Sequence, residues 1–109
     1  MKSVHYRDLA LDDIDASIDY YATVSTDVAR RWVEALQRAV ADIGRHPRLG
    51  SSRFAEHLGI EGLRHRTLRK FPYLVFYIES DSNILIVRVL HERRDVDGEL
   101  GDSARDASE

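Results

Sequence analysis

The spacing of the apolar residues changes once along the chain, near residue 63, and this change restricts the folds that the chain can adopt. Before residue 47, apolar side chains recur at intervals of about three or four positions, which predicts two amphipathic helices. From Leu63 onward they form short, nearly continuous runs, which predict strands. A chain of 109 residues has room for one domain, so the helices and strands must share it. We therefore predict the α+β class.

Two helices are predicted, on either side of the polar segment Ser25-Thr26-Asp27, which supplies the cap of the second helix. Asp8 is the predicted cap of the first helix, whose core-facing stripe consists of Leu11, Ile14, Ile18 and Tyr21. The second helix presents to the core Val28, Trp32, Leu36, Val40 and Ile43. It ends at His46-Pro47, because proline disfavours the helical conformation in the residue before it. Two helices joined by so short a turn form an antiparallel hairpin.

The remaining elements are strands and loops. Residues 47–62 are rich in glycine and serine and are predicted to form a loop. Strands are predicted over residues 4–6, 63–68, 73–79 and 84–91. The last two runs are apolar at nearly every position, so they should be central strands covered on both sides. The predicted order is β-α-α-β-β-β, with the helical hairpin packed on a mainly antiparallel four-stranded sheet.

Charge is divided unevenly along the chain. Residues 1–42 carry 5 basic and 8 acidic side chains, residues 43–94 carry 10 and 5, and residues 95–109 carry 1 and 6. The basic middle consists mainly of arginine, which suits phosphate and carboxylate partners, although a solvated charged face explains it equally well. The acidic end has no hydrophobic periodicity. We therefore predict a domain over residues 1–96 and a disordered tail over residues 97–109.

Several classes of site have no support in the sequence. The chain has no cysteine, which excludes disulfides and thiolate metal sites and suits the cytoplasm. The five histidines lack the paired spacing of a metal site, and no phosphate-binding glycine loop is present. No apolar run approaches the ~18 residues of a membrane span, and the N-terminal residues do not resemble a signal peptide. We expect no cofactor, no metal and no membrane contact.

Short motifs occur in a fixed order along the chain. Asp12-Asp13-Ile14 and Tyr20-Tyr21 lie in the first predicted helix, and Ala29-Arg30-Arg31-Trp32 lies in the second. They are followed by the P-x-x-G of residues 47–50, the G-x-R of residues 62–64, the segment 71–77 and the V-x-H-x-R-R-D of residues 89–95. This ordered set, over residues 4–96, resembles the ParE/RelE superfamily of bacterial toxins, and its last motif resembles the ParE-like branch.

The resemblance implies a toxin of a type II toxin–antitoxin system, held inactive by an antitoxin whose C-terminal segment wraps the helices and sheet. ParE-like members are known as poisons of DNA gyrase, whereas RelE-like members cut messenger RNA on the ribosome. Most of the RelE-like nuclease residues are missing, because the resemblance places Thr67 and Leu74 at two basic positions and Glu92 near a third. We therefore expect a gyrase poison without catalytic chemistry. The alternatives are a ribosome-dependent nuclease that uses His91, Arg69 and Arg93, and a non-toxic binding module with the same fold.

Two sets of residues are predicted to bind partners. The target-binding set consists of Arg64, Arg66, Arg88, His91, Arg93 and Arg94. The antitoxin-binding set lines an apolar groove between the helices and the sheet and consists of Leu11, Ile18, Trp32, Val40 and Phe76. Simpler roles are a structural histidine, bonded to the backbone or to Asp95, and a salt-bridged strand exit. The expected partners are a cognate antitoxin, ParD-like or of another family, and DNA gyrase, in a toxin–antitoxin hetero-oligomer.

Overall fold

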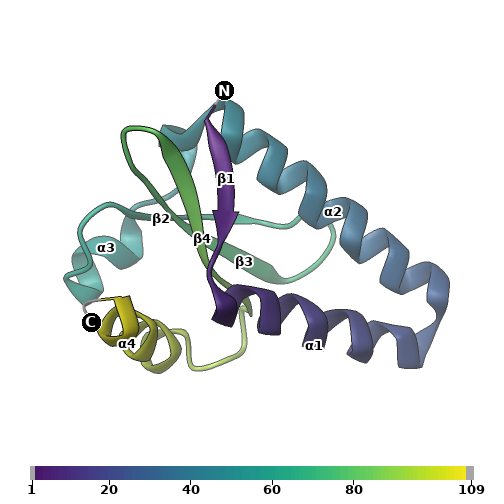
Figure 1. Cartoon of the computed structure of the whole chain (residues 1–109). Helices are drawn as coiled ribbons and strands as arrows, with labels where there is room; N and C mark the ends of the chain where they lie inside the picture. The colour runs from purple at the N-terminus through teal and green to yellow at the C-terminus, as the bar shows by residue number, and fades with distance from the viewer. Residues whose placement is uncertain (1, 108–109) are drawn as a thin grey trace.

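A computed structural model describes residues 2–107 of the chain and the side chains of residues 2–101, so residues 1, 108 and 109 of the predicted domain and tail lie outside it. Its elements are β1 (Ser3–Tyr6), α1 (Asp8–Val24), α2 (Thr26–Arg45), the 3-10 turn η1 (Pro47–Leu49), α3 (Arg53–Leu58), β2 (Leu63–Thr67), β3 (Tyr73–Glu79), β4 (Asn83–His91) and α4 (Val96–Ala107) (Figure 1). The predicted β-α-α-β-β-β order is confirmed, with α3 and α4 as additional helices. Over the described range, no helix has both the length and the hydrophobicity needed to cross a membrane.

The four strands form one sheet in the order β1-β4-β3-β2. β3 pairs antiparallel with both β2 and β4, whereas β1 lies parallel to β4. The predicted mainly antiparallel sheet is confirmed, and so are its two central strands, whose residues are nearly all buried. The register between β3 and β4 shifts once, which leaves Val87 as the extra residue of a bulge in β4.

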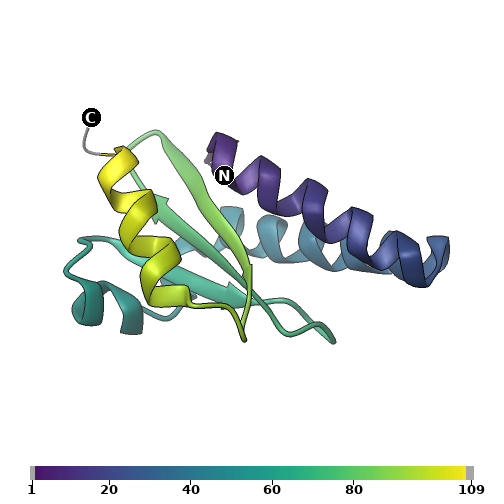
Figure 2. The same cartoon turned by 90° about the horizontal axis from the view of Figure 1, so that it is seen from below.

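The helical hairpin covers one face of the sheet, as the two views show together (Figures 1 and 2). Only Ser25 separates α1 from α2, and its hydroxyl accepts a hydrogen bond from the backbone N–H of Val28 at 3.0 Å, as the cap prediction requires. Trp32 of α2 packs in the same cluster as Val75 and Tyr77 of β3. Because side chains alternate along a strand, Phe76, which lies between Val75 and Tyr77, points to the other face of the sheet.

Two details of α1 differ from the prediction. The N-cap is Arg7, and Asp8 is the first helical residue, so Asp8 does not cap the helix. Leu11 is 45% exposed, whereas Ala10 and Ser17 are buried. The small side chains of these two residues let the helix lie close to the sheet. The rest of the predicted stripe is confirmed, because Ile14, Ile18 and Tyr21 pack against the core cluster on this face.

The opposite face of the sheet is covered by α3 and α4 (Figure 2). Phe54 of α3 and Val96 and Leu100 of α4 join Leu74 and Phe76 in a second core cluster, in which Leu100 is only 1% exposed. The prediction of an unbroken loop over residues 47–62 is therefore wrong, and so is that of a disordered tail for residues 97–107. The apolar signal of α4 consists of only two side chains at helical spacing, and the surrounding carboxylates obscure it.

Candidate functional site

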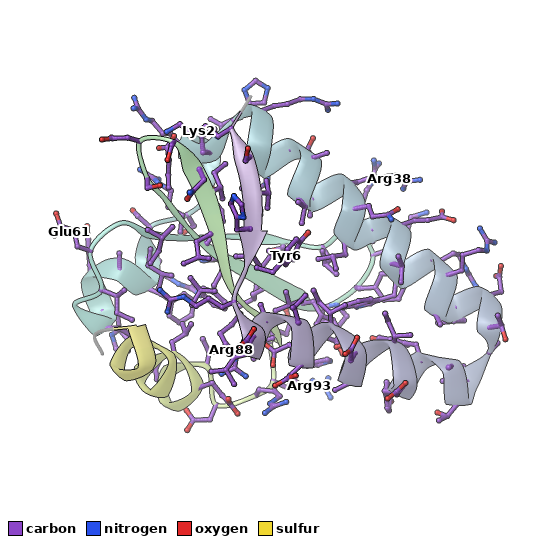
Figure 3. The ribbon with its side chains drawn as sticks, viewed as in Figure 1. Lys2, Tyr6, Arg38, Glu61, Arg88 and Arg93 are labelled. Atoms are coloured by element: carbon purple, nitrogen blue, oxygen red, sulfur yellow. The ribbon has the colours of Figure 1, made fainter. Side chains whose placement is uncertain are left out.

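Arg88 lies at the centre of a buried ionic cluster and is only 5% exposed. Its guanidinium donates to both carboxylate oxygens of Asp13, from Nε at 2.7 Å and from Nη2 at 2.8 Å, and its Nη1 lies 3.0 Å from Oε2 of Glu99. The hydrogen bond to Asp13 raises the pKa of Arg88 further above its ordinary value. Figure 3 shows the side chain between α1 and α4. Arg88 therefore joins three elements of the fold, and its side chain is buried in these contacts rather than exposed for the predicted target binding.

Asp13 occupies this position because β1 is short. β1 ends at Tyr6, and the backbone N–H of Arg7 still donates to the carbonyl of Ile86 at 3.0 Å. The next part of the β4 edge faces α1, where Oδ2 of Asp13 accepts the backbone N–H of Val89 at 3.0 Å. One carboxylate thus satisfies an edge amide and a buried arginine. The sequence analysis did not assign Asp13 a role. Its position three residues after the buried Ala10, on the core side of the helix, was the available signal.

Arg64 and Arg66 lie on β2, separated from β4 by β3. Nη1 of Arg64 donates to the carbonyl of Gly50 at 2.8 Å, and Nη2 of Arg66 lies 3.9 Å from Oδ2 of Asp42 in α2. Both side chains therefore point to the hairpin face, as their alternation predicts. The six predicted target-binding residues do not form one surface.

His91, Arg93 and Arg94 remain together at the exit of β4. Nδ1 of His91 accepts the backbone N–H of Arg93 at 3.1 Å, which matches the simpler structural role, although the partner is not Asp95. The guanidinium of Arg94 lies 2.5 Å from Oε1 of Glu99. Within the described chain, the guanidinium of Arg93 makes no ion pair or hydrogen bond, and Figure 3 shows this residue near the outer margin of the molecule below α1.

The turn between β2 and β3 lies beside this exit, because the backbone N–H of Glu92 donates to the carbonyl of Pro72 at 2.8 Å. The turn carries Arg69 and Lys70, both exposed and, within the described chain, without an ion pair. Lys70 has a φ of 69°, a left-handed conformation that costs a residue with a Cβ about 1–2 kcal/mol. We refer to Arg69, Lys70 and Arg93 as the cationic end. The structure thus brings Arg69 to the same end as His91 and Arg93.

A small pocket opens between α1 and the ends of β3 and β4. It encloses about 180 Å³ and is lined by Asp13, Ala16, Ser17, Tyr20, Tyr73, Val89, His91 and Arg94. We call it the aromatic pocket, because three of these residues carry rings. The rings of Tyr73 and His91 meet edge to face at 5.2 Å, and Tyr20 is 62% exposed at the rim. The sequence analysis named Tyr20 only as part of the Tyr20-Tyr21 motif and did not assign Tyr73 to a site.

A wider hollow, of about 550 Å³, lies on the α3–α4 face. Arg53, His65 and Glu92 line it, and Nδ1 of His65 is buried there without a hydrogen-bond partner in the described structure. Burial, and then the charge of Arg53, lowers the pKa of His65. Thr67 and Leu74 also line this hollow, so the two positions that are basic in RelE-like nucleases hold an uncharged polar and an apolar side chain here.

The predicted antitoxin-binding set is divided by the sheet. Trp32 and Phe76 are both fully buried, and they belong to the clusters on opposite faces, so they line no common groove. Both are large apolar residues, and the sequence alone does not show on which face of the sheet each of them packs. Ile18 and Val40 are half-buried on the hairpin, and Leu11 is exposed on the same side of α1 as Ile18.

No metal site emerges from the described side chains, since no three histidine, aspartate or glutamate residues are grouped so as to hold an ion. The described chain is an α+β protein with four helices and one four-stranded sheet, and arginine, lysine and aromatic residues carry the chemistry of its surface.

The chain belongs to the family of ParE toxins of type II toxin–antitoxin systems, whose sequence model matches residues 4–96. A solved structure from the chromosomal ParDE toxin–antitoxin system of P. aeruginosa has the same fold, with a TM-score of 0.69 and 24% sequence identity over 84% of this chain and 96% of that chain. No curated protein matches the sequence. The predicted family and fold are therefore confirmed, and most of α4 lies beyond the matched residues.

Proposed function

We propose that this chain is a toxin that binds DNA gyrase, holds it as an enzyme–DNA intermediate, and is neutralised by a cognate antitoxin. The observation that carries the proposal is membership of the ParE family over residues 4–96. The cationic end supports it, since its cations have no ion-pair partners within the described chain and can bind a target without breaking internal contacts.

The proposed target-binding surface is smaller than the predicted set. It retains His91 and Arg93 and gains Arg69 and Lys70, which lie at the same end of the sheet. The bonds that Arg64, Arg66 and Arg94 make within the chain would have to be exchanged for bonds to a target. These three side chains are therefore secondary contacts in this proposal.

The proposed antitoxin surface lies on the helical hairpin. Leu11 is exposed there and Ile18 and Val40 are half-buried, and Tyr20 and Val24 offer exposed apolar area elsewhere on α1. A disordered antitoxin segment that folds on this surface loses conformational entropy, so a long wrapped interface is required. An antitoxin that also covers Tyr20 would block the aromatic pocket, which lies next to the cationic end.

The proposal is tested by adding the purified chain to two assays in parallel, gyrase supercoiling and translation of a defined messenger RNA. We expect supercoiling to stop, with cleaved DNA accumulating, and the messenger RNA to remain intact. Cleaved messenger RNA with unaffected supercoiling would refute the assignment and favour the alternative nuclease of His91, Arg69 and Arg93. The absence of both effects would favour the non-toxic binding module.

Two substitutions refine the test. Arg93→Glu should weaken gyrase inhibition about tenfold or more, because it reverses a charge at the proposed interface, whereas Arg38→Glu, on the exposed side of α2, should not. His91→Ala should weaken the inhibition in part, as the loss of one binding contact, and should not abolish it, because the proposal gives this side chain no proton-transfer step. Loss of toxicity in a folded His91→Ala variant would favour the enzyme.

A further inference from the structure

We propose that the aromatic pocket binds one unstacked base of a single-stranded nucleic acid while the cationic end binds the adjoining phosphates. The inference rests on the proposed function, because a gyrase–DNA intermediate is the expected source of such a strand. It adds a ligand class and a site: a base between Tyr20, Tyr73 and His91.

The rings of the pocket are held in place from behind. Tyr73 meets Trp32 edge to face at 5.3 Å on one side and His91 at 5.2 Å on the other. Burial, followed by the charge and hydrogen bond of Tyr73, raises the pKa of the neighbouring Tyr21 to about 12, so that phenol stays neutral. Tyr20 is 62% exposed at the rim, where its ring meets that of Tyr21 edge to face at 5.1 Å. A preformed wall with one exposed ring suits a planar ligand, which enters without rearranging the core.

The size of the pocket matches one ring system. Its volume of about 180 Å³ lies below the range of about 300–1,000 Å³ that is typical of sites for whole small molecules. Stacking of one base on an aromatic side chain contributes about 1–3 kcal/mol and does not depend strongly on the base. The pocket is therefore suited to a single base of a longer strand.

The polar groups of the pocket do not oppose such a ligand. Both oxygens of the Asp13 carboxylate are bonded to Arg88 or to the N–H of Val89, and the hydroxyl of Ser17 donates to the carbonyl of Asp13 at 2.8 Å. Nδ1 of His91 accepts the N–H of Arg93, which leaves the ring proton on Nε2 as a donor to the base.

The charges around the pocket give the strand one favourable direction. The residues of α1 that line the pocket are Asp13, Ala16, Ser17 and Tyr20, and the exposed aspartates at positions 8, 12, 15 and 19 form the next stripe along the helix, with Asp12 and Asp19 adjacent to Ala16. A phosphate chain across that stripe would be repelled. On the other side it meets Arg93 and the turn with Arg69 and Lys70, where it is attracted.

An acidic peptide would also be attracted to the cationic end, so the rings decide between the two ligands. A peptide carboxylate pairs with arginine or lysine and does not need three aromatic side chains next to it. A base does need them. The dependence of binding on Tyr20 is therefore the measurement that separates a nucleic acid from an acidic protein segment.

The test measures fluorescence anisotropy of a labelled oligothymidine of about ten nucleotides, titrated with the purified full chain at several salt concentrations. Tyr20→Ala should weaken binding about tenfold, because it removes one stacking partner. Arg93→Ala should weaken binding about threefold. It should also reduce the slope of log K against log salt concentration by about 0.7, which is the contribution of one phosphate contact in a single strand. The matched controls are Leu49→Ala, which removes an exposed apolar side chain on η1, and Arg38→Ala on α2, and both should stay within about twofold of the wild type.

Three results would overturn the inference: no binding by the wild type at low salt, equal effects of Tyr20→Ala and Leu49→Ala, or equally tight binding of a blunt duplex. The inference would also be overturned if Tyr20→Ala weakened binding of the antitoxin but not binding of the oligonucleotide. Comparing the affinities for the deoxyribo and ribo forms of the oligonucleotide shows whether the bound strand is DNA or RNA. Gyrase inhibition that survives alongside a failed binding test overturns this inference alone, whereas Tyr20-dependent binding without gyrase inhibition overturns the proposed function alone.

Discussion

The two faces of the sheet are covered in different ways. On the hairpin face, α1 and α2 supply large apolar side chains, and Trp32 and Ile43 are completely buried there. On the other face, α3 is six residues long, and the buried apolar side chains among those described in α4 are Val96 and Leu100. Polar contacts complete the attachment of α4: Glu99 forms ion pairs with Arg88 and Arg94, and Nε2 of His57 lies within hydrogen-bond distance of Oδ2 of Asp97, at 2.9 Å. The hairpin face thus depends on apolar burial, whereas the α4 face depends partly on charge.

The largest expected effect comes from Asp13, which the α4 face needs although it lies on α1. Asp13→Ala should lower the free energy of unfolding by about 3–5 kcal/mol, because Arg88 would remain buried without its main partner. Urea unfolding measures the change. Asp12→Ala, an exposed neighbour on the same helix, should change it by less than about 0.5 kcal/mol. Similar values for both variants would show that the cluster does not support the fold.

A smaller effect is expected from Leu100, and it should be local. Leu100→Ala should cost about 2–3 kcal/mol, in the lower part of the range for buried leucine, since α4 can shift towards the sheet. In hydrogen exchange, amides of α4 should exchange faster, while those of α2 keep their protection. Leu49→Ala, at an exposed leucine, is the control. Uniformly faster exchange in all helices would contradict the distinction between the two faces.

On the hairpin face, a steric change should have an effect that does not depend on salt. Gly50 follows η1, and a Cβ there would collide with the hydroxyl of Tyr77, which donates to the carbonyl of Pro47 at 2.6 Å. Gly50→Ala should therefore cost about 1–2 kcal/mol through overpacking. The loss should be equal in thermal melts at low and high salt, because no ion pair is involved. A loss that varies with salt would contradict this assignment.

The smallest effect concerns acid. The hydrogen bond from Arg94 lowers the pKa of Glu99 below its ordinary value of 4.5. Glu99 therefore stabilises the fold above that pH, and this contribution is lost as the pH falls through the lowered value. When the pH is reduced from 6 to 3, the free energy of unfolding should fall less in Glu99→Gln than in the wild type. The difference should be below about 1 kcal/mol, because the pair lies near the surface. Glu79 and Asp27, whose pKa values are also lowered by cations, titrate in both proteins and cancel in the difference. Parallel curves for the two proteins would show that Glu99 contributes nothing.

The hairpin and the four strands could be predicted from the sequence, because their apolar residues repeat over many positions. The bounds of β3 were predicted to the residue, and the cap at Ser25 was also predicted. α4 could not be predicted, since its apolar signal is only Val96 and Leu100. The helix is held in place by contacts with residues far away in the chain, on α3 and the sheet, and no local sequence pattern reveals such contacts.

The site was predictable in part. The V-x-H-x-R-R-D motif placed His91, Arg93 and Arg94 in the predicted target-binding set, which stays a prediction. In the structure they lie at the exit of β4, where Arg94 pairs with Glu99. Arg88 was assigned to the surface because arginine is rarely buried. Its burial follows from a carboxylate that lies 75 positions earlier in the chain, and pairing over such a separation depends on the tertiary fold.

The parallel pairing of β1 with β4 sets the order of folding events. Ser3 pairs with Asn83, so the strand that leaves the ribosome early must wait for one that is made about 80 residues later. The growing chain can form its helices, but it cannot close the sheet until β4 has emerged. We therefore expect any chain that terminates before β4 to remain unfolded and open to proteases.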